Sequence, residues 1–261
     1  MKLESVTNHI NSLSYLFHIE MYPNALLYAE IDRTFAQRVI STWSAFTSCC
    51  SMSVSDGIEL RQFVPDRNVW LSASLECSTL KLNPELEPVI SFDCKILCEI
   101  LQLLPTADTL ILTITKDQPH VLRVGEVGQL EIIPALSLDY QTATGNLCEF
   151  NDTEDLRDFI GSIEDCECVH FSMLLSASSV WFNIGSACKS WAVTPTEPTA
   201  ALHIHGAYAI PLINLRDAIQ SIDQCQLLVT PIGTAAITHT LGQNQFCIHL
   251  ASTNTSTSTL G

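Results

Sequence analysis

The chain has 261 residues, of which 47% are hydrophobic, and its 28 acidic and 12 basic residues give a formal net charge of −16. This hydrophobic content indicates a folded protein with a sizeable core and argues against disorder. No apolar run reaches the roughly 18 residues that a membrane helix needs, and the negative charge argues against tight binding of nucleic acid.

The N-terminus and the cysteines favour a reducing compartment. Lys2 is not followed by an apolar core and a small-residue cleavage site, so we expect no secretory signal peptide. The eleven cysteines have no repeated spacing, and we expect them to be reduced and mostly buried thiols.

The first half of the chain contains two amphipathic helices, each followed by strands. Residues 1–23 are predicted to be an N-terminal extension, and residues 24–134 a first domain that opens with the strand "ALLYAEI". A helix is predicted from Asp32, with Ala36, Val39, Ile40 and Trp43 on one face. Alternating strands follow, separated by the hairpin turn Ser55-Asp56-Gly57. The second helix, "FDCKILCEILQLL", precedes the strands "DTLILTI" and "HVLRV".

The second half repeats this order. Residues 135–146 are predicted to connect the halves, and residues 147–252 to form a second domain, with the helices "DTEDLRDFIGSIED" and "INLRDAIQSI". The offset of roughly 120 residues fits two tandem copies of a domain-sized unit rather than a solenoid. Residues 253–261 are predicted to form a disordered Ser/Thr tail. Many strands with four helices predict an α+β fold, with helices on one face of antiparallel sheets.

Three segments carry a resemblance to a known family. "DGIELRQFVPDRNVWLSASL", "IIPALSLDYQT" and "QFCIHLAST" resemble, in this order, a hairpin with its next strand, an interdomain connector and a last strand of DNA sliding clamps, the proliferating cell nuclear antigen superfamily. The resemblance implies two tandem clamp domains, with sheets outside a ring and four helices lining its hole. It also implies a nuclear, non-catalytic subunit that encircles double-stranded DNA weakly and without sequence preference. Its partners would be other clamp subunits, a clamp loader, and replication, repair or signalling proteins.

Three branches of this superfamily remain open. "INLRDAIQSI" and the Ser/Thr tail resemble the tail-bearing subunit of the heterotrimeric checkpoint clamp, which acts at damaged DNA. The alternatives are the homotrimeric replication clamp and a viral polymerase processivity factor. The resemblance therefore favours DNA-damage checkpoint signalling and repair, with DNA replication as the alternative.

The clamp interpretation requires cations on the exposed faces of the helices, because side chains that line the hole contact phosphates. Lys95 and Arg216 fall at matching places in the two halves. The candidate DNA-facing residues are Arg33, Arg38, Lys95, Arg157 and Arg216. So few cations predict weak, salt-dependent contact with DNA.

The resemblance also implies a hydrophobic pocket beneath the connector for partner proteins. The candidate partner-binding residues are Phe63, Val64, Val69, Leu136, Leu138, Tyr140 and Leu250, which are alternatively core or connector residues. Ring closure would pair open sheet edges, and the predicted edge strands are Thr109 to Ile114 and Val169 to Leu174.

An enzyme is the weaker interpretation. His203 and His205 alternate on a predicted strand, a spacing that could ligate zinc, but no CxxC motif accompanies them. The sequence has no GxSxG motif, no HExxH motif and no phosphate-binding glycine loop. Asp93 and Asp152 are expected to cap helices rather than to act as catalytic acids. We therefore predict no catalytic residues, no metal and no cofactor. The third function class that the sequence leaves open is a protein-interaction scaffold unrelated to DNA.

Overall fold

The computed structural model describes residues 24–86, 89–105, 107–134, 148–150, 157–158, 161, 168–174, 179–184, 189–193, 208–220, 226–229, 235–251 and 253–254. At residues 134, 148–150, 168–174, 179–184, 189–193, 208–209, 220, 226–229, 235 and 253–254, only the backbone is described. None of the described helices is long and apolar enough to span a membrane.

The first half alternates strands with two helices. Its elements are β1 (Ala25–Asp32), α2 (Arg33–Phe46), β2 (Cys49–Val54), β3 (Ile58–Val64), the 3-10 turn η1 (Pro65–Arg67), β4 (Val69–Leu75), β5 (Cys77–Leu82), β6 (Val89–Asp93), α3 (Cys94–Leu103), β7 (Thr109–Thr115), β8 (Gln118–Val124), β9 (Gly128–Glu131) and β10 (Ile133–Pro134). The hairpin predicted at Ser55-Asp56-Gly57 joins β2 to β3, and the Ser55 amide donates to the Gly57 carbonyl at 3.0 Å.

The second half follows the same order where it is described. Its elements are β11 (Cys148–Phe150), β12 (Cys168–Leu174), β13 (Ser179–Ile184), β14 (Lys189–Val193), β15 (Tyr208–Pro211), α5 (Leu212–Gln220), β16 (Gln226–Val229), β17 (Ala235–Leu241), β18 (Asn244–Leu250) and β19 (Thr253–Asn254).

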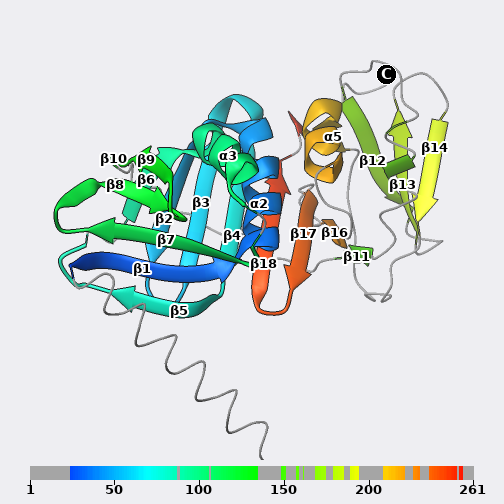
Figure 1. The fold of residues 1–261 in the computed structure, drawn as a ribbon. Coiled ribbons are helices and arrows are strands. Elements are labelled where there is room, and N and C mark those ends of the chain that lie inside the picture. The colour runs from blue at the N-terminus through cyan, green and yellow to red at the C-terminus, as the bar shows by residue number, and fades with distance from the viewer. Residues whose placement is uncertain are drawn as a thin grey trace, which may run out of the picture.

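The strands form three antiparallel sheets. Two have five strands, in the orders β5-β1-β7-β8-β9 and β14-β13-β12-β15-β19. The third has nine strands in the order β10-β6-β2-β3-β4-β18-β17-β16-β11, and it joins the two halves where β4 pairs with β18. The described helices α2, α3 and α5 lie side by side on one side of the strands, with α2 between the other two (Figure 1).

The apolar periodicity of α2 builds the core between the helices and the sheets. Its predicted face of Ala36, Val39, Ile40 and Trp43 is at most 3% exposed, and Trp43 stacks on Phe246 of β18. Asp32 caps the helix, because its carboxylate accepts a hydrogen bond from the Phe35 amide at 2.6 Å.

Asp93 caps α3 in the same way, accepting hydrogen bonds from the amides of Lys95 and Ile96. The N-cap prediction for Asp93 is therefore confirmed. The helix lies tightly against β9: a Cβ added to Gly128 would stand 2.5 Å from Cγ2 of Ile100 and 2.7 Å from the carbonyl oxygen of Val124. Glycine at this position therefore sets the distance between α3 and the end of the five-stranded sheet.

Three expectations need correction or lie outside the described residues. The structure describes three of the four expected helices; of the fourth, only residues 157, 158 and 161 are described. The predicted edge strands are wrong, because β7 pairs with β1 and β8, and β12 pairs with β13 and β15. The tail expected to begin at residue 253 starts with β19, which pairs with β15; residues 255–261 lie outside the described part.

Candidate nucleic-acid and partner interfaces

Arg33 does not belong to the exposed face on which the sequence analysis placed it. Its side chain is 7% exposed and extends from the start of α2 to the end of α3. There its guanidinium donates hydrogen bonds to the carbonyls of Leu101 at 3.0 Å and Leu104 at 2.9 Å, and to that of Pro105. Arg33 thus satisfies carbonyls at the C-terminus of a neighbouring helix. The prediction that it faces DNA is wrong.

The side chains of the other four candidate cations are exposed or partly exposed to solvent. Lys95 is exposed at the start of α3, while Arg38 on α2 and Arg216 on α5 are partly exposed. Arg157 is also partly exposed, and one of its guanidinium nitrogens lies 3.4 Å from the carbonyl oxygen of Ile219. These four residues belong to the helical side of the molecule.

Lys95 and Arg216 do not occupy equivalent positions, contrary to the expectation from sequence that they match in the two halves. Each helix begins directly after a strand, so Cys94 matches Leu212, and the buried Leu97 matches Leu215. In this alignment Lys95 corresponds to Ile213, and Arg216 corresponds to Cys98. The apolar stripe of a short helix leaves its register open by one turn, and only the junction with the preceding strand fixes it.

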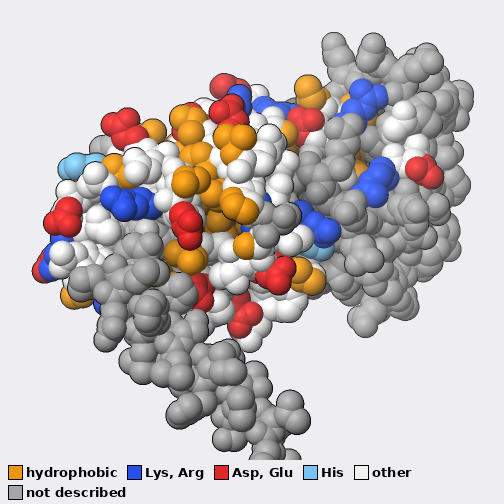
Figure 2. Space-filling view, viewed as in Figure 1, with side chains coloured by type: hydrophobic (Ala, Val, Ile, Leu, Met, Phe, Trp, Pro, Cys, Tyr) orange, Lys and Arg blue, Asp and Glu red, His pale blue; other side chains and the backbone are white. Residues whose placement is uncertain are grey.

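The face that carries the helices is not strongly basic. Hydrophobic side chains gather over the region of α3, and on the described residues in view basic side chains are scattered among acidic ones (Figure 2). Ile96 and Ile213 are 47% and 63% exposed, and Glu99 is also exposed. This surface can offer only weak electrostatic attraction to phosphates.

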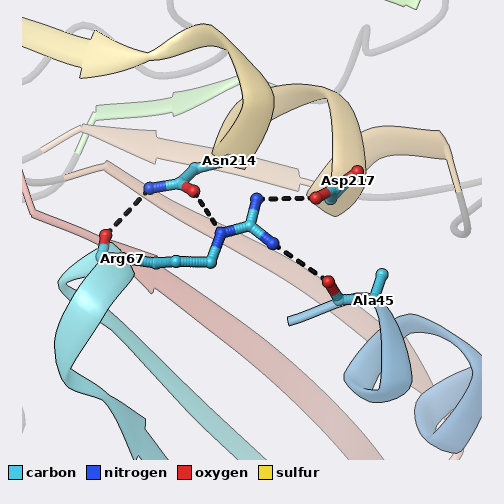
Figure 3. A network of polar contacts seen from close by, with 4 residues as sticks. All are labelled: Ala45, Arg67, Asn214 and Asp217. Atoms are coloured by element: carbon cyan, nitrogen blue, oxygen red, sulfur yellow. Dashed lines mark hydrogen bonds and ion pairs between the residues drawn. The ribbon is translucent and has the colours of Figure 1, made fainter. Parts of the chain in front are cut away.

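A polar network joins the two halves on this side, and the sequence analysis missed it (Figure 3). Arg67, in η1 between β3 and β4, donates from Nε to Oδ1 of Asn214 at 2.7 Å and from Nη2 to Oδ2 of Asp217 at 2.6 Å, both on α5. Its Nη1 donates to the Ala45 carbonyl of α2 at 2.9 Å, and its guanidinium carbon lies 4.6 Å from the ring centre of Phe46. Asn214 in turn donates to the carbonyl of Arg67 at 2.9 Å.

This network fixes α5 beside α2 through one planar guanidinium that uses all three of its nitrogens. The only sequence signal for it is a cation in a turn between two strands, which by itself does not indicate a partner 147 residues away.

Three of the residues predicted to line the partner pocket are buried, and their neighbours in sequence face outward instead. Val64, Val69 and Leu250 are 8%, 0% and 0% exposed and belong to the core, so the prediction that they contact partners is wrong. Side chains alternate between the faces of a sheet, so their neighbours point away from the helices.

On that outer face, Phe63 stacks on Trp70 with ring centres 4.2 Å apart, and Trp70 lies opposite His249 across the β4–β18 pair. Phe63, Trp70 and His249 are all partly exposed. They form an aromatic row that crosses the joint between the two halves. Leu136, Leu138 and Tyr140 lie outside the described residues.

Cys247 and His249 form a pair at one end of this row. The Cys247 Sγ lies 3.1 Å from Nε2 of His249. Burial raises the pKa of the Cys247 thiol to about 12 and lowers the pKa of His249 from its usual range. Both groups are therefore held neutral, which makes this cysteine a poor nucleophile.

Among the described residues, no three His, Cys, Asp or Glu side chains gather in a way that could hold a metal ion. His203, His205 and Asp152 lie outside the described part.

The sequence matches no protein-family model and no curated protein. Solved structures do match. A PCNA from Thermococcus kodakaraensis is 17% identical and has a TM-score of 0.69, and the match covers 87% of this chain and all of the other. The chain has the fold of proliferating cell nuclear antigen, PCNA.

Two further PCNA structures match over a similar length. A PCNA2–PCNA3 complex from Sulfolobus tokodaii is 15% identical with a TM-score of 0.66, covering 86% of this chain and 98% of the other. A PCNA from A. fulgidus bound to the C-terminal region of FEN-1 is 13% identical with a TM-score of 0.70, covering 87% and 98%. The PCNA fold therefore spans nearly the whole of this chain.

Proposed function

We propose that this protein is a non-catalytic subunit of a DNA sliding clamp that encircles duplex DNA in the nucleus and recruits partner proteins. The observation that carries the proposal is the joint between the halves. A nine-stranded sheet runs through both halves without a break, and α2, α3 and α5 stand side by side on one side of it. This is the PCNA arrangement over nearly the whole chain.

The contact with DNA rests on few cations. Lys95, Arg38, Arg157 and Arg216 are the candidates on the helical side, and Arg33 no longer belongs to them. The exposed carboxylate of Glu99 offsets part of this positive charge, and Ile96 and Ile213 are exposed without adding any charge. Phosphate contacts of this number give weak, salt-dependent binding, so closure of a ring around DNA, rather than affinity, would keep the protein in place.

A topological experiment tests the proposal. The full chain, in nuclear extract that supplies a clamp loader and other subunits, is bound to a nicked circular plasmid on beads, which is then washed with salt and linearised. We expect retention on the circle and release when the DNA is cut. Equal retention on circular and linear DNA, or none on either, contradicts the proposal.

The same assay tests whether the candidate cations on the helices contact the DNA. The double variant Lys95→Glu/Arg216→Glu should shorten retention, while the free energy of unfolding changes by no more than about 0.5 kcal/mol because both side chains reach the surface. Lys81→Glu is the matched control, since Lys81 is exposed on β5, away from the helices. Retention that is unchanged in the double variant removes Lys95 and Arg216 from the DNA contact.

Ring assembly is proposed to use other strands than those predicted from sequence. β9 pairs only with β8, and β14 only with β13, among the described residues. β9 follows β8 in the first half as β18 follows β17 in the second, and β14 occupies the place of β4. Because β18 pairs with β4 inside the chain, β9 of one subunit would pair with the β14 counterpart of the next.

Partner proteins are proposed to bind the outer face of the nine-stranded sheet. Phe63 and Trp70 supply a stacked aromatic surface there. The connector residues Leu136, Leu138 and Tyr140 are the proposed remainder of this site. The A. fulgidus PCNA bound to the C-terminal region of FEN-1 supports the view that such folds receive segments of repair proteins.

The branch that we propose is the checkpoint clamp, with a role in DNA-damage signalling and repair. The supporting feature is a C-terminal segment, "STNTSTSTLG", with seven hydroxyl residues that kinases could modify. The alternative is a replication clamp or a cellular or viral polymerase processivity factor, and the likeness to PCNA structures fits either branch.

A further inference from the structure

A pocket opens between the five-stranded sheet of the first half and the nine-stranded sheet, at the end where β1 begins. Its volume is about 290 Å³. Its apolar lining consists of Leu26 of β1, Leu86 before β6, Ile90 of β6, Pro119 of β8 and Ile132 between β9 and β10. Packed protein interiors contain few voids larger than a water molecule, so a pocket of this size is a place where further side chains can bind.

The charge of this pocket favours an apolar occupant. Glu85 also lines it, but its carboxylate lies 2.8 Å from Nζ of Lys116 and already has a cation partner. The side chains of Leu86 and Ile132 remain partly exposed, although both pack against the core. An apolar occupant would remove them from water, which is the favourable change.

The N-terminal extension joins the described chain at the edge of this pocket. Asn24 stands two residues before Leu26, and its carbonyl accepts a hydrogen bond from the Lys116 amide at 2.9 Å. Lys116 lies in the turn from β7 to β8, three residues before Pro119. Five extended residues span at most about 18 Å, so the residues just before Asn24 can reach the lining of the pocket.

The last part of the extension has the pattern of an apolar occupant. In the run "FHIEMY", residues 17–22, Phe17, Ile19 and Met21 alternate with more polar neighbours. A period of two predicts that these three apolar side chains share one face. Pro23 has no amide with which to lengthen the ladder of β1, which favours a change of direction directly before that strand.

We infer that the N-terminal extension folds back on the first half and fills this pocket with the apolar face formed by Phe17, Ile19 and Met21. The pocket is then a docking surface whose ligand is a segment of the same chain. The inference goes beyond the proposed clamp function and does not rest on it.

A filled pocket would also hold the start of the connector. Ile132 lines the pocket, its amide donates to the carbonyl of His120 at 2.8 Å, and β10 follows it directly. The connector, residues 135–146, continues from β10. The extension thus acts on residues that lead into the proposed partner site.

Photocrosslinking of the full chain tests the docking directly. The photoreactive amino acid p-benzoylphenylalanine replaces Ile19 in one sample and Ser5 in a control sample, and mass spectrometry identifies the crosslinked residues. We expect position 19, and not position 5, to crosslink to Leu86, Pro119 or Ile132.

Three results would overturn the inference. The first is crosslinking of position 19 to the helices, to the outer face of the nine-stranded sheet or to a second molecule. The second is equal crosslinking of the pocket from positions 19 and 5. The third is no crosslink to the pocket at all.

A pair of substitutions measures what the docking does to the pocket. In the full chain, Ile19→Asp should make the Ile132 amide exchange with deuterium at least about tenfold faster, because burial of one aliphatic side chain contributes this much or more to the closed state. His18→Asp adds the same charge at the next, polar position and should leave this exchange rate unchanged. Equal rates in the two variants contradict the inference.

Both measurements use the chain without DNA, so their outcome is separate from that of the circular-DNA assay. A chain whose extension docks but which is not retained on circular DNA would contradict the clamp proposal alone.

Discussion

Arg33 shows how far one side chain can depart from a helical-wheel expectation. Its position on α2 is polar by periodicity, but the helix starts beside the end of α3, where carbonyl groups have no intrahelical donors. A buried arginine that bonds three such carbonyls is a structural residue.

The variant Arg33→Ala should therefore lower the free energy of unfolding by about 2 kcal/mol or more, because buried carbonyls lose a charged donor. Arg38→Ala, on the partly exposed part of the same helix, is the control and should cost about 0.5 kcal/mol or less. Urea denaturation of the purified chain measures both. Equal costs for the two variants would contradict the structural role of Arg33.

His249 predicts a pH dependence of stability. Burial lowers its pKa in the folded chain, so the unfolded chain binds the proton more readily. The contribution of this residue is fully present above its unfolded pKa of about 6.5 and is lost as the pH falls through and below that value.

As the pH drops below about 6.5, the free energy of unfolding should therefore fall more steeply for the wild type than for His249→Gln. Chemical denaturation at several pH values compares the two slopes, so that carboxylates common to both proteins cancel. Parallel slopes would show that His249 titrates alike in the folded and unfolded chains.

At the scale of elements, the direction of the backbone decides which strands can accept a neighbour. The Ile132 amide donates to the carbonyl of its partner His120 at 2.8 Å. Along an antiparallel ladder, hydrogen-bonded pairs alternate with pairs that are not hydrogen-bonded. Gln129 and its partner Arg123 form a pair of the second kind, so the amide of Gln129 points away from β8, toward the free edge of β9.

The variant Gln129→Pro should thus keep the fold, with a loss of about 1 kcal/mol or less, and prevent pairing with the next subunit. Ile111→Pro, in the strand first predicted as an edge, should unfold the protein, because β7 is paired on both sides. Circular dichroism and native mass spectrometry of mixtures with sibling subunits measure these effects. Intact assembly in folded Gln129→Pro would exclude β9 as the interface.

At the scale of the whole molecule, the C-terminal segment separates the two proposed branches. β19 pairs with β15, so a truncation at residue 252 would remove part of a sheet as well as the segment beyond it. A chain that ends at Asn254 keeps β19 and removes residues 255–261.

If the checkpoint branch holds, the chain that ends at Asn254 should still be retained on circular DNA but lose damage signalling, because each phosphate in the segment adds close to two negative charges that a partner can read. Phosphorylation of checkpoint proteins after irradiation of cells that carry each form measures this. A matched full-length control has Thr255, Ser256, Thr257, Ser258 and Thr259 changed to alanine. Unchanged signalling in both variants would favour the replication alternative.

The local sequence pattern by itself determined where several helices, caps and turns of this protein form. The apolar spacing of α2 predicted its buried face, Asp93 its cap, and Ser55-Asp56-Gly57 its hairpin, because each depends on neighbours within a few residues. The duplicated order of elements led to the clamp fold, which the PCNA structures match.

Tertiary structure decided everything that depends on distant partners. Whether β7 is an edge, which of Val69 and Trp70 faces outward, and where the guanidinium groups of Arg33 and Arg67 lie are set by pairing between segments far apart in the chain. Period and composition report only that a side chain is apolar or charged. The register of β4 against β18 and the closeness of α2 to α3 and α5 decide what it contacts.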